Sequence, residues 1–331
     1  MGCLDPARIF CAGVAAHMQS LQELGIFMPG SRIGVLLIHG LTGTPTEKKL
    51  IARRLNNYGF SVLCPRLAGH CGSEAELLAT NWQDWADSAE NAFSRLAEHM
   101  DVVFVGGLSA GAVLSLYLSH LHPEKVRGAA LYSITLRWDG WTIPKLSFLL
   151  PLVLRVPYIG KRYRFEEAFP YGLMNERIRS LIFSQMHSGD AEAAGFTGTP
   201  GFSLREMRKL VARVKKSMPD INTPTLVVHS SNDDVASAKS NALYVCNHLK
   251  GPCELLLLDN SYHMVTVDQE RDKVGDATAR FFNNLLSPAE KLELASKARK
   301  AVPESWSEAG EGAGERDLSI EDEDKPQSAT C

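Results

Sequence analysis

The pentapeptide Gly107-Leu108-Ser109-Ala110-Gly111 constrains this chain more than any other stretch. It follows the apolar run Val102–Val105 and precedes a helical pattern, Ala112–Leu121. A Gly-x-Ser-x-Gly between a strand and a helix is typical of a nucleophile elbow, a turn so tight that the serine backbone is strained. The flanking glycines let the strand and the helix pass close to the serine, and the helix N-terminus favours an oxyanion there. The pattern therefore predicts Ser109 as a nucleophile.

Strands and helices alternate on both sides of this turn. Apolar runs without polar alternation are typical of strands that are buried on both faces of a sheet. The predicted strands are Ile33–Ile38, Phe60–Cys64, Val102–Val105, Val126–Tyr132, Thr225–His229 and Glu254–Leu258. The predicted helices are Thr46–Tyr58, Asp84–His99, Ala112–Leu121, Ala238–His248 and Gln269–Leu286. This α/β order predicts a mostly parallel central sheet flanked by helices, which binds ligands beyond the carboxyl ends of its strands.

The chain of 331 residues divides into a core and three other segments. Residues 1–30 are a weakly patterned N-terminal segment, with a short helix predicted around Val14–Leu24. Residues 31–134 and 220–287 form the two parts of the predicted core, and residues 135–219 between them form a mainly helical cap. Residues 288–331 include the acidic stretch Glu304–Lys325, which is poor in apolar residues and predicts a disordered tail.

Charge and cysteine content limit the classes of function. The formal net charge is -3 at pH 7, which gives no indication of nucleic-acid binding. No stretch reaches the roughly 18 apolar residues that span a bilayer, and Met1–Ser20 does not resemble a signal peptide. The seven cysteines are scattered without a Cys-x-x-Cys pair, which argues against a disulfide framework or a zinc site. We therefore expect mostly reduced thiols in a cytoplasmic protein.

A serine nucleophile needs a base, usually a histidine that a carboxylate orients. In a fold with this elbow, the order along the chain is serine, then aspartate or glutamate, then histidine. His263 follows the last predicted strand, and Asp233 and Asp234 follow the strand before it. We prefer Asp233, because Val235 then lies two residues later and can anchor the loop in apolar packing, but Asp234 stays open. The histidines predicted to be structural are His39, His70, His229 and His248.

The tetrahedral intermediate of acyl transfer needs two N–H donors, the oxyanion hole. The first is predicted to be Ala110, the residue after the nucleophile. The second is expected in the loop after the strand that ends at His39-Gly40, most simply Leu41. Gly40 and Gly43 allow this loop to bend close to a substrate.

Several segments match the motifs of one superfamily, namely Gly34–Pro45, Cys64–His70, Gly107–Gly111 and Asn260–Asp268. Together they resemble the α/β-hydrolase superfamily, most specifically the bacterial carboxylesterases and monoacylglycerol lipases among the serine aminopeptidase S33-like hydrolases. The resemblance covers roughly residues 32–135 and 220–285. It implies Ser109 as nucleophile, His263 as base, Asp233 as its partner, and Leu41 and Ala110 as oxyanion-hole donors. It also implies acyl transfer to the serine and hydrolysis by water, with no metal or cofactor.

The chain is therefore expected to cleave carboxylic esters, with medium-chain or monoacylglycerol-like substrates. A thioesterase or acyltransferase with the same triad is one alternative, and a non-catalytic binding protein on the same scaffold is another. The cap leaves a further choice between two roles. Its apolar run Ile143–Ile159 and the basic helix Ser203–Ser217 form either a lid in transient contact with lipid or, as we favour, a pocket wall.

Overall fold

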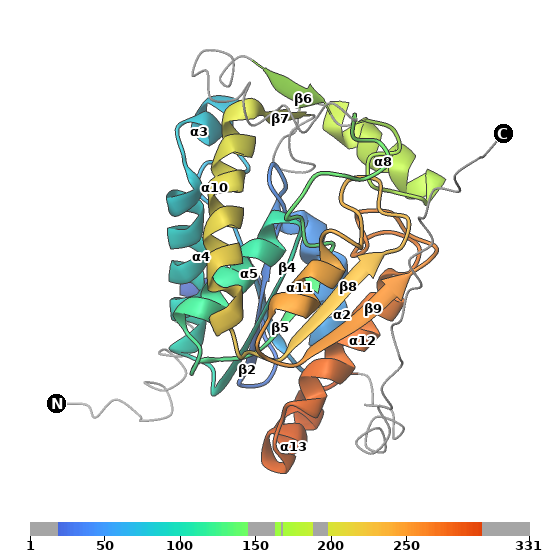
Figure 1. The fold of residues 1–331 in the computed structure, drawn as a ribbon. Helices are drawn as coiled ribbons and strands as arrows, with labels where there is room; N and C mark the ends of the chain where they lie inside the picture. The colour runs from blue at the N-terminus through green and yellow to red at the C-terminus, as the bar shows by residue number, and fades with distance from the viewer. Residues whose placement is uncertain (1–18, 145–162, 167, 188–197, 300–331) are drawn as a thin grey trace, which may run out of the picture.

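The computed structural model describes residues 19–144, 163–166, 168–187 and 198–299, and a seven-stranded sheet runs through them (Figure 1). In sheet order the strands are β1 (Gly25–Met28), β3 (Ser61–Pro65), β2 (Ile33–Ile38), β4 (Val102–Leu108), β5 (Val126–Tyr132), β8 (Thr225–Ser230) and β9 (Cys253–Leu258). β1 pairs antiparallel with β3, and all other neighbours are parallel. The predicted α/β fold class is confirmed.

The two faces of the sheet pack into separate cores, because side chains alternate along each strand. On β2, Leu37 belongs to one core and Ile38 to the other. α2 and α12 contribute to the first core, and α4, α5, α10 and α11 contribute to the second. The bounds are α2 (Lys49–Asn57), α3 (Glu74–Leu78), α4 (Trp82–Ala97), α5 (Ala110–Leu121), α10 (Gly201–Ser217), α11 (Ala242–His248) and α12 (Arg271–Asn284). Two short 3-10 helices, η1 (Pro45–Lys48) and η3 (Met218–Asp220), precede α2 and follow α10.

Helix α10 was expected in the cap, but it packs mainly against the core, and its first residue, Gly201, is hydrogen-bonded to the cap residue Tyr163. Figure 1 shows α10 beside α4 on one side of the sheet. Its apolar stripe is buried in the same core as α4 and α5, through Met207, Leu210, Val211 and Val214. The core therefore resumes at α10, before the boundary expected at residue 220.

The cap contains β6 (Arg164–Glu166), α8 (Glu176–His187) and β7 (Gly198–Pro200). β6 and β7 pair antiparallel, although no strand was expected in this segment. Each has three residues, which is too short for a periodic pattern to indicate it. Apart from its first two residues, the apolar run Ile143–Ile159 lies outside the described residues.

Elements near both ends of the described chain correct the prediction. β1 adds an edge strand in the segment expected to be weakly patterned, after a helical turn at residues 19–22. α13 (Pro288–Lys297) lies in the segment predicted to be disordered. Ser287 and Glu290 form a capping box at its start, and Leu294 is 1% exposed. The predicted disorder is wrong for α13, and residues 300–331 lie outside the described residues.

Cys246 of α11 and Cys253 of β9 form a disulfide, which contradicts the expectation of reduced thiols for this pair. The turn from α11 to β9 brings their Cα atoms to 5.3 Å, a usual separation for bridged cysteines. Cys64 is a buried thiol and Cys71 a half-buried one. A spacing of seven residues matches no cysteine motif, so the sequence offered no signal for this bridge.

Candidate active site

The elbow predicted at Ser109 is present between β4 and α5. Ser109 has a φ of 55° and a ψ of -110°, a combination that residues with a side chain rarely adopt. A Cβ on Gly111 would collide with the carbonyl oxygen of Ile38, and one on Gly107 would collide with the Gly111 backbone. Because both glycines lack a Cβ, β4, β2 and α5 can approach closely and hold Ser109 half-buried at the tip of the turn.

The hydroxyl of Ser109 lies 3.0 Å from that of Thr135, which follows β5. Thr135 Oγ1 also lies 3.2 Å from the carbonyl oxygen of Ser133. A hydroxyl carries one proton and two lone pairs, so Thr135 can donate to the Ser133 carbonyl oxygen while it accepts a hydrogen bond from the Ser109 hydroxyl. Thr135 therefore restrains the position of the serine oxygen. Sequence reasoning missed this residue because no motif marks it.

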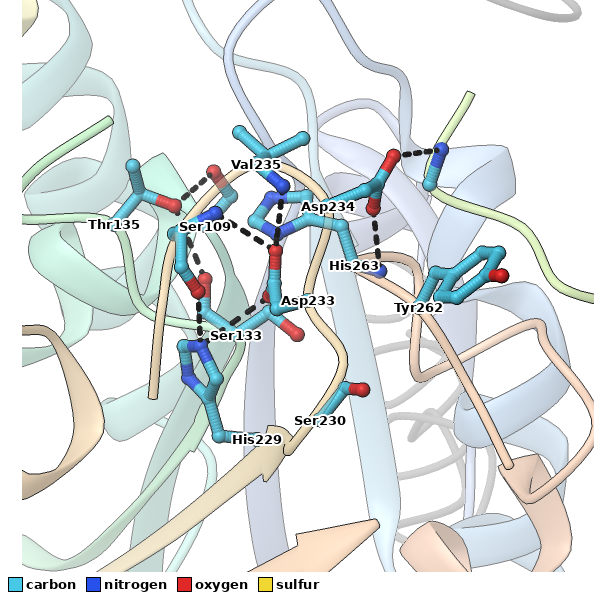
Figure 2. A network of polar contacts seen from close by, with 12 residues as sticks. Ser109, Ser133, Thr135, His229, Ser230, Asp233, Asp234, Val235, Tyr262 and His263 are labelled. Atoms are coloured by element: carbon cyan, nitrogen blue, oxygen red, sulfur yellow. Dashed lines mark hydrogen bonds and ion pairs between the residues drawn. The ribbon is translucent and has the colours of Figure 1, made fainter. Parts of the chain in front are cut away.

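Asp233 is the carboxylate that faces the imidazole of His263. Its oxygens lie 2.8 and 3.0 Å from His263 Nδ1, and Figure 2 shows Asp233 between the rings of His263 and His229. The carboxylate holds the imidazole proton on Nδ1 and leaves Nε2 unprotonated, as a base requires. The geometry thus favours Asp233 over Asp234, and the approach of His263 to Ser109 stays a prediction.

A second imidazole, that of His229, contacts the same carboxylate. His229 Nε2 lies 3.2 Å from Asp233 Oδ2 and 2.7 Å from the carbonyl oxygen of Ala236. Asp233 Oδ1 accepts the backbone N–H groups of Val235 and Ala236 at 2.9 and 2.8 Å. Burial opposes the charged form of Asp233, but the two imidazoles, His263 and His229, outweigh it and hold the pKa of Asp233 well below the usual range. His229, predicted to be structural only, therefore helps to keep Asp233 ionised.

Asp234 turns away from the imidazole ring and accepts backbone N–H groups instead (Figure 2). Its two oxygens accept from His263 N at 3.1 Å and from Gly172 N at 3.0 Å. Burial raises the pKa of Asp234 by more than the nearby His263 lowers it. Asp234 thus ties the loop that carries His263 to the cap.

Asp268 makes a second tie between the same two segments. Its fully buried carboxylate accepts the backbone N–H groups of Tyr262 at 2.9 Å, Met174 at 2.8 Å and Asn175 at 2.9 Å. Tyr262 precedes the candidate base, and the other two residues belong to the cap. The cap segment Gly172–Asn175 is therefore fixed to the loop of His263 at two points.

The predicted oxyanion-hole loop passes beside the nucleophile. A Cβ built on Gly40 would lie 3.8 Å from Ser109 Cβ. Thr42 has a φ of 65°, and its hydroxyl donates to the carbonyl oxygen of Leu41. Ala110 is the first residue of α5, where N–H groups have no partner within the helix. These positions suit Leu41 and Ala110 as donors, a role that stays a prediction.

Two buried histidines stand behind this loop. His39 Nδ1 donates to the carbonyl oxygen of Gly40 at 2.9 Å, and its Nε2 accepts from Leu67 N at 3.3 Å. Burial lowers the pKa of His39 to about 4 and that of His70 to about 3, so both rings are neutral at pH 7.

Within the described ranges, no three histidine, cysteine, aspartate or glutamate side chains are grouped so as to hold a metal ion.

The chain is similar to known proteins over the sheet, the site and the cap. The family model Hydrolase_4, described as serine aminopeptidase S33, matches residues 30–270. A thermostable monoacylglycerol lipase of Bacillus sp. (strain H-257) is 27% identical over 252 residues, which cover 76% of this chain and 90% of that protein. A carboxylesterase of Bacillus subtilis (strain 168) is 24% identical over 257 residues, which cover 77% of this chain and 94% of that protein.

Solved structures share the fold. A metagenome-derived lipolytic enzyme, from a study of LipS and LipT, aligns with a TM-score of 0.66 at 26% identity over 78% of this chain and 96% of its own. The monoacylglycerol lipase of Paleococcus ferrophilus aligns with a TM-score of 0.65 at 16% identity over 79% of this chain and 98% of its own. The predicted superfamily and enzyme class are thereby confirmed. Because the family model spans both parts of the core and the cap between them, the chain belongs to the serine aminopeptidase S33 family of α/β-hydrolases.

Proposed function

We propose that the protein hydrolyses carboxylic esters through an acyl-enzyme intermediate on Ser109. The observation that carries this proposal is the His263–Asp233 pair at 2.8 Å, at the same edge of the sheet as the strained Ser109. A histidine with its Nδ1 proton fixed by a carboxylate is the base that a serine at a helix N-terminus needs. The relatives named monoacylglycerol lipase and carboxylesterase support an ester as the substrate.

The proposed reaction has two acyl-transfer steps. His263 accepts the Ser109 proton while Oγ attacks the ester carbonyl, and Leu41 N and Ala110 N stabilise the oxyanion. Collapse of the intermediate breaks the ester C–O bond, and His263 gives its proton to the leaving alcohol. Water then attacks the acyl carbon, His263 takes and returns one proton, and the carboxylic acid leaves with Ser109 restored.

A series of p-nitrophenyl esters from acetate to palmitate, together with monoacylglycerols, tests this function. We expect hydrolysis with a maximum at medium acyl length, the substrate class predicted from the sequence. The cap contacts the candidate base, since a Cβ on Gly172 would lie 3.2 Å from His263 Cβ, so the cap is the part expected to limit acyl length. Activity on thioesters alone, or transfer to a competing alcohol, would instead favour a thioesterase or an acyltransferase. A folded protein that neither turns over any ester nor reacts with a fluorophosphonate probe would favour the binding scaffold.

We propose that transient contact with lipid involves the cap and not α10. The apolar stripe of α10 is buried, so this helix exposes basic side chains such as Arg213. The cap exposes Phe169 at 67%, Leu181 at 60% and Tyr163 at 52%. In vesicle flotation, Phe169→Ser should lower the bound fraction, whereas Leu292→Ser, at an exposed leucine of α13, should not. Equal binding by both variants would rule out the cap surface.

We propose a cytoplasmic location, which the scatter of the cysteines supports. Among the helices of the described segments, none is both long and apolar enough to cross a membrane. Disulfides form mainly in oxidising compartments, so the state of the Cys246–Cys253 pair in cells tests this location. In a cytoplasmic protein Cys246 and Cys253 should be reduced, so a thiol-alkylating reagent added to intact cells should label both. Protection of both residues from alkylation would contradict the proposed location.

A further inference from the structure

Lys48, in the short helix η1, is completely buried, which is unusual for a lysine. Its ammonium group lies 3.7 Å from Glu47 Oε2 and 3.3 Å from Thr266 Oγ1. A buried ion pair contributes little net stability, because the loss of hydration offsets the attraction between the charges. Stability therefore does not explain why this pair lies where it does.

The pair lies directly behind the predicted oxyanion-hole loop. Glu47 Oε2 accepts the N–H of Gly40 at 3.4 Å, and a Cβ on Gly43 would collide with Glu47 Oε1. A Cβ on Gly40 would lie 3.9 Å from Glu47 Oε2 and 3.8 Å from Ser109 Cβ. The Glu47 carboxylate therefore fills the space beside Gly40 and Gly43. Gly40 directly precedes the predicted donor Leu41 and lies close to Ser109.

The lysine extends this contact to the opposite side of the site. Thr266, its second partner, lies three residues after His263 in the same loop. Glu47 and Lys48 thus form a continuous polar link from the Gly40 peptide to the loop of the candidate base. A shift of either residue would move the oxyanion-hole loop relative to His263.

The charges of the pair matter for an oxyanion. A lone carboxylate beside the oxyanion hole would oppose the negative charge that forms there, and the Lys48 ammonium cancels it. Burial lowers the pKa of Lys48 to about 8, against the opposing effect of Glu47. The other titratable groups that face it are Cys64 from β3, whose pKa burial raises to about 12, and the neutral His39. Near neutral pH the pair therefore carries no net charge, and above about pH 8 the carboxylate is left alone.

We propose that Glu47 and Lys48 are positioning residues of the oxyanion hole: Glu47 fixes the Gly40 peptide, and Lys48 anchors Glu47 and neutralises its charge. This inference rests on the proposed acyl transfer at Ser109. Neither residue touches the substrate in this scheme. Their effect is on the placement and the electrostatics of the donors that do.

The test compares Lys48→Met, Glu47→Gln and the double variant Glu47→Gln/Lys48→Met with Lys49→Met, a change at the neighbouring exposed lysine. We expect Lys48→Met to lower kcat by about 10- to 100-fold with KM changed little, since the lone carboxylate weakens the oxyanion hole. The double variant, which is uncharged but keeps an amide oxygen for Gly40, should recover to within about threefold of the parent protein. Lys49→Met should behave like the parent protein.

The pH profile gives a readout that a purely structural role would not move. The parent protein should lose kcat above about pH 8, as Lys48 loses its proton, and the double variant should not. If Lys48→Met does not fold, the pH profiles of the parent protein and the double variant still test the inference. The double variant is expected to fold because it buries no charge. A normal kcat for folded Lys48→Met, or the same alkaline loss in the double variant, overturns the inference.

The rate of labelling of Ser109 by a fluorophosphonate separates this inference from the proposed ester cleavage. Labelling needs the nucleophile and the oxyanion hole but no ester turnover. Slower labelling of Lys48→Met, restored in the double variant, supports the pair even where no ester is cleaved. Equal labelling rates in all variants overturn the pair and leave the ester hydrolase intact, and a parent protein that is not labelled overturns both.

Discussion

Replacement of Ser109 by alanine is expected to lower kcat for ester hydrolysis by about five to six orders of magnitude. The reason is that alanine cannot form the acyl-enzyme bond, so only oxyanion-hole stabilisation and binding remain. Steady-state turnover of the best p-nitrophenyl ester, with its limit set by the uncatalysed rate, measures the loss. Substrate binding to the folded variant should persist, because the β4–α5 turn keeps its glycines.

Ser119→Ala is the matched control for this variant. Ser119 is a buried serine of α5, the helix that follows Ser109, and its hydroxyl donates within this helix to the carbonyl oxygen of Ser115. We expect kcat within about twofold of the parent protein, because a serine hydroxyl that donates to the carbonyl oxygen four residues earlier in a helix contributes little. Retention of ester turnover in Ser109→Ala would show that another group is the nucleophile.

Asp233→Asn is expected to lower kcat by about 10⁴-fold. An asparagine has the same shape, but its amide donates to His263 Nδ1 and so stabilises the wrong tautomer. The low pKa of Asp233 keeps it ionised at every working pH, so titration of this carboxylate should contribute nothing to the pH dependence of the parent protein between about pH 6 and pH 9. The kinetics of the parent protein and the purified variant across this range check both statements.

The free energy of unfolding should also depend on the ionisation of Asp233 at acidic pH. The pKa of folded Asp233 lies below its unfolded value of about 3.9, so its stabilising contribution is present above that pH and lost as the pH falls. The asparagine variant should lack this part of the acid-induced loss of stability. Urea denaturation at several acidic pH values measures it.

Asp234→Asn separates the two neighbouring aspartates. Asp234 contacts the backbone of His263 and Gly172, and an asparagine oxygen still accepts one of these N–H groups. We therefore expect a loss of kcat of no more than about tenfold. A larger loss in Asp234→Asn than in Asp233→Asn would reverse the roles of the two carboxylates.

The elements that were predictable are those whose signal is local and repeated. The apolar runs of β2, β3, β4, β5 and β8 indicate strands buried on both faces of a sheet, and the glycines around Ser109 indicate the turn. The run of β9 also indicates a strand, but this strand lies at the edge of the sheet and is only partly buried. Asp233 and His263 were found from chain order, because parallel strands place their carboxyl ends at one edge. The preference for Asp233 over Asp234 agrees with the observed contact to Nδ1.

The features that sequence analysis missed depend on tertiary contacts. His229 and Thr135 matter through atoms far along the chain or across a loop, so no spacing reveals them. Lys48 looks like any surface lysine in the sequence, and only the packed structure shows that it is buried. α13 is the exception, because its start carries a local signal, the capping-box residues Ser287 and Glu290. The acidic composition of the residues that follow predicted disorder instead.

The two ties between the cap and the loop of His263 limit how substrate preference in this protein can change. Asp234 and Asp268 bind Gly172–Asn175 and the base loop with the same carboxylates. A cap transplanted from a relative would displace the imidazole unless it reproduced the backbone path of these four residues. Gly172–Asn175 is therefore the junction to preserve when the cap is exchanged, and new specificity is best sought in side chains on either side of it.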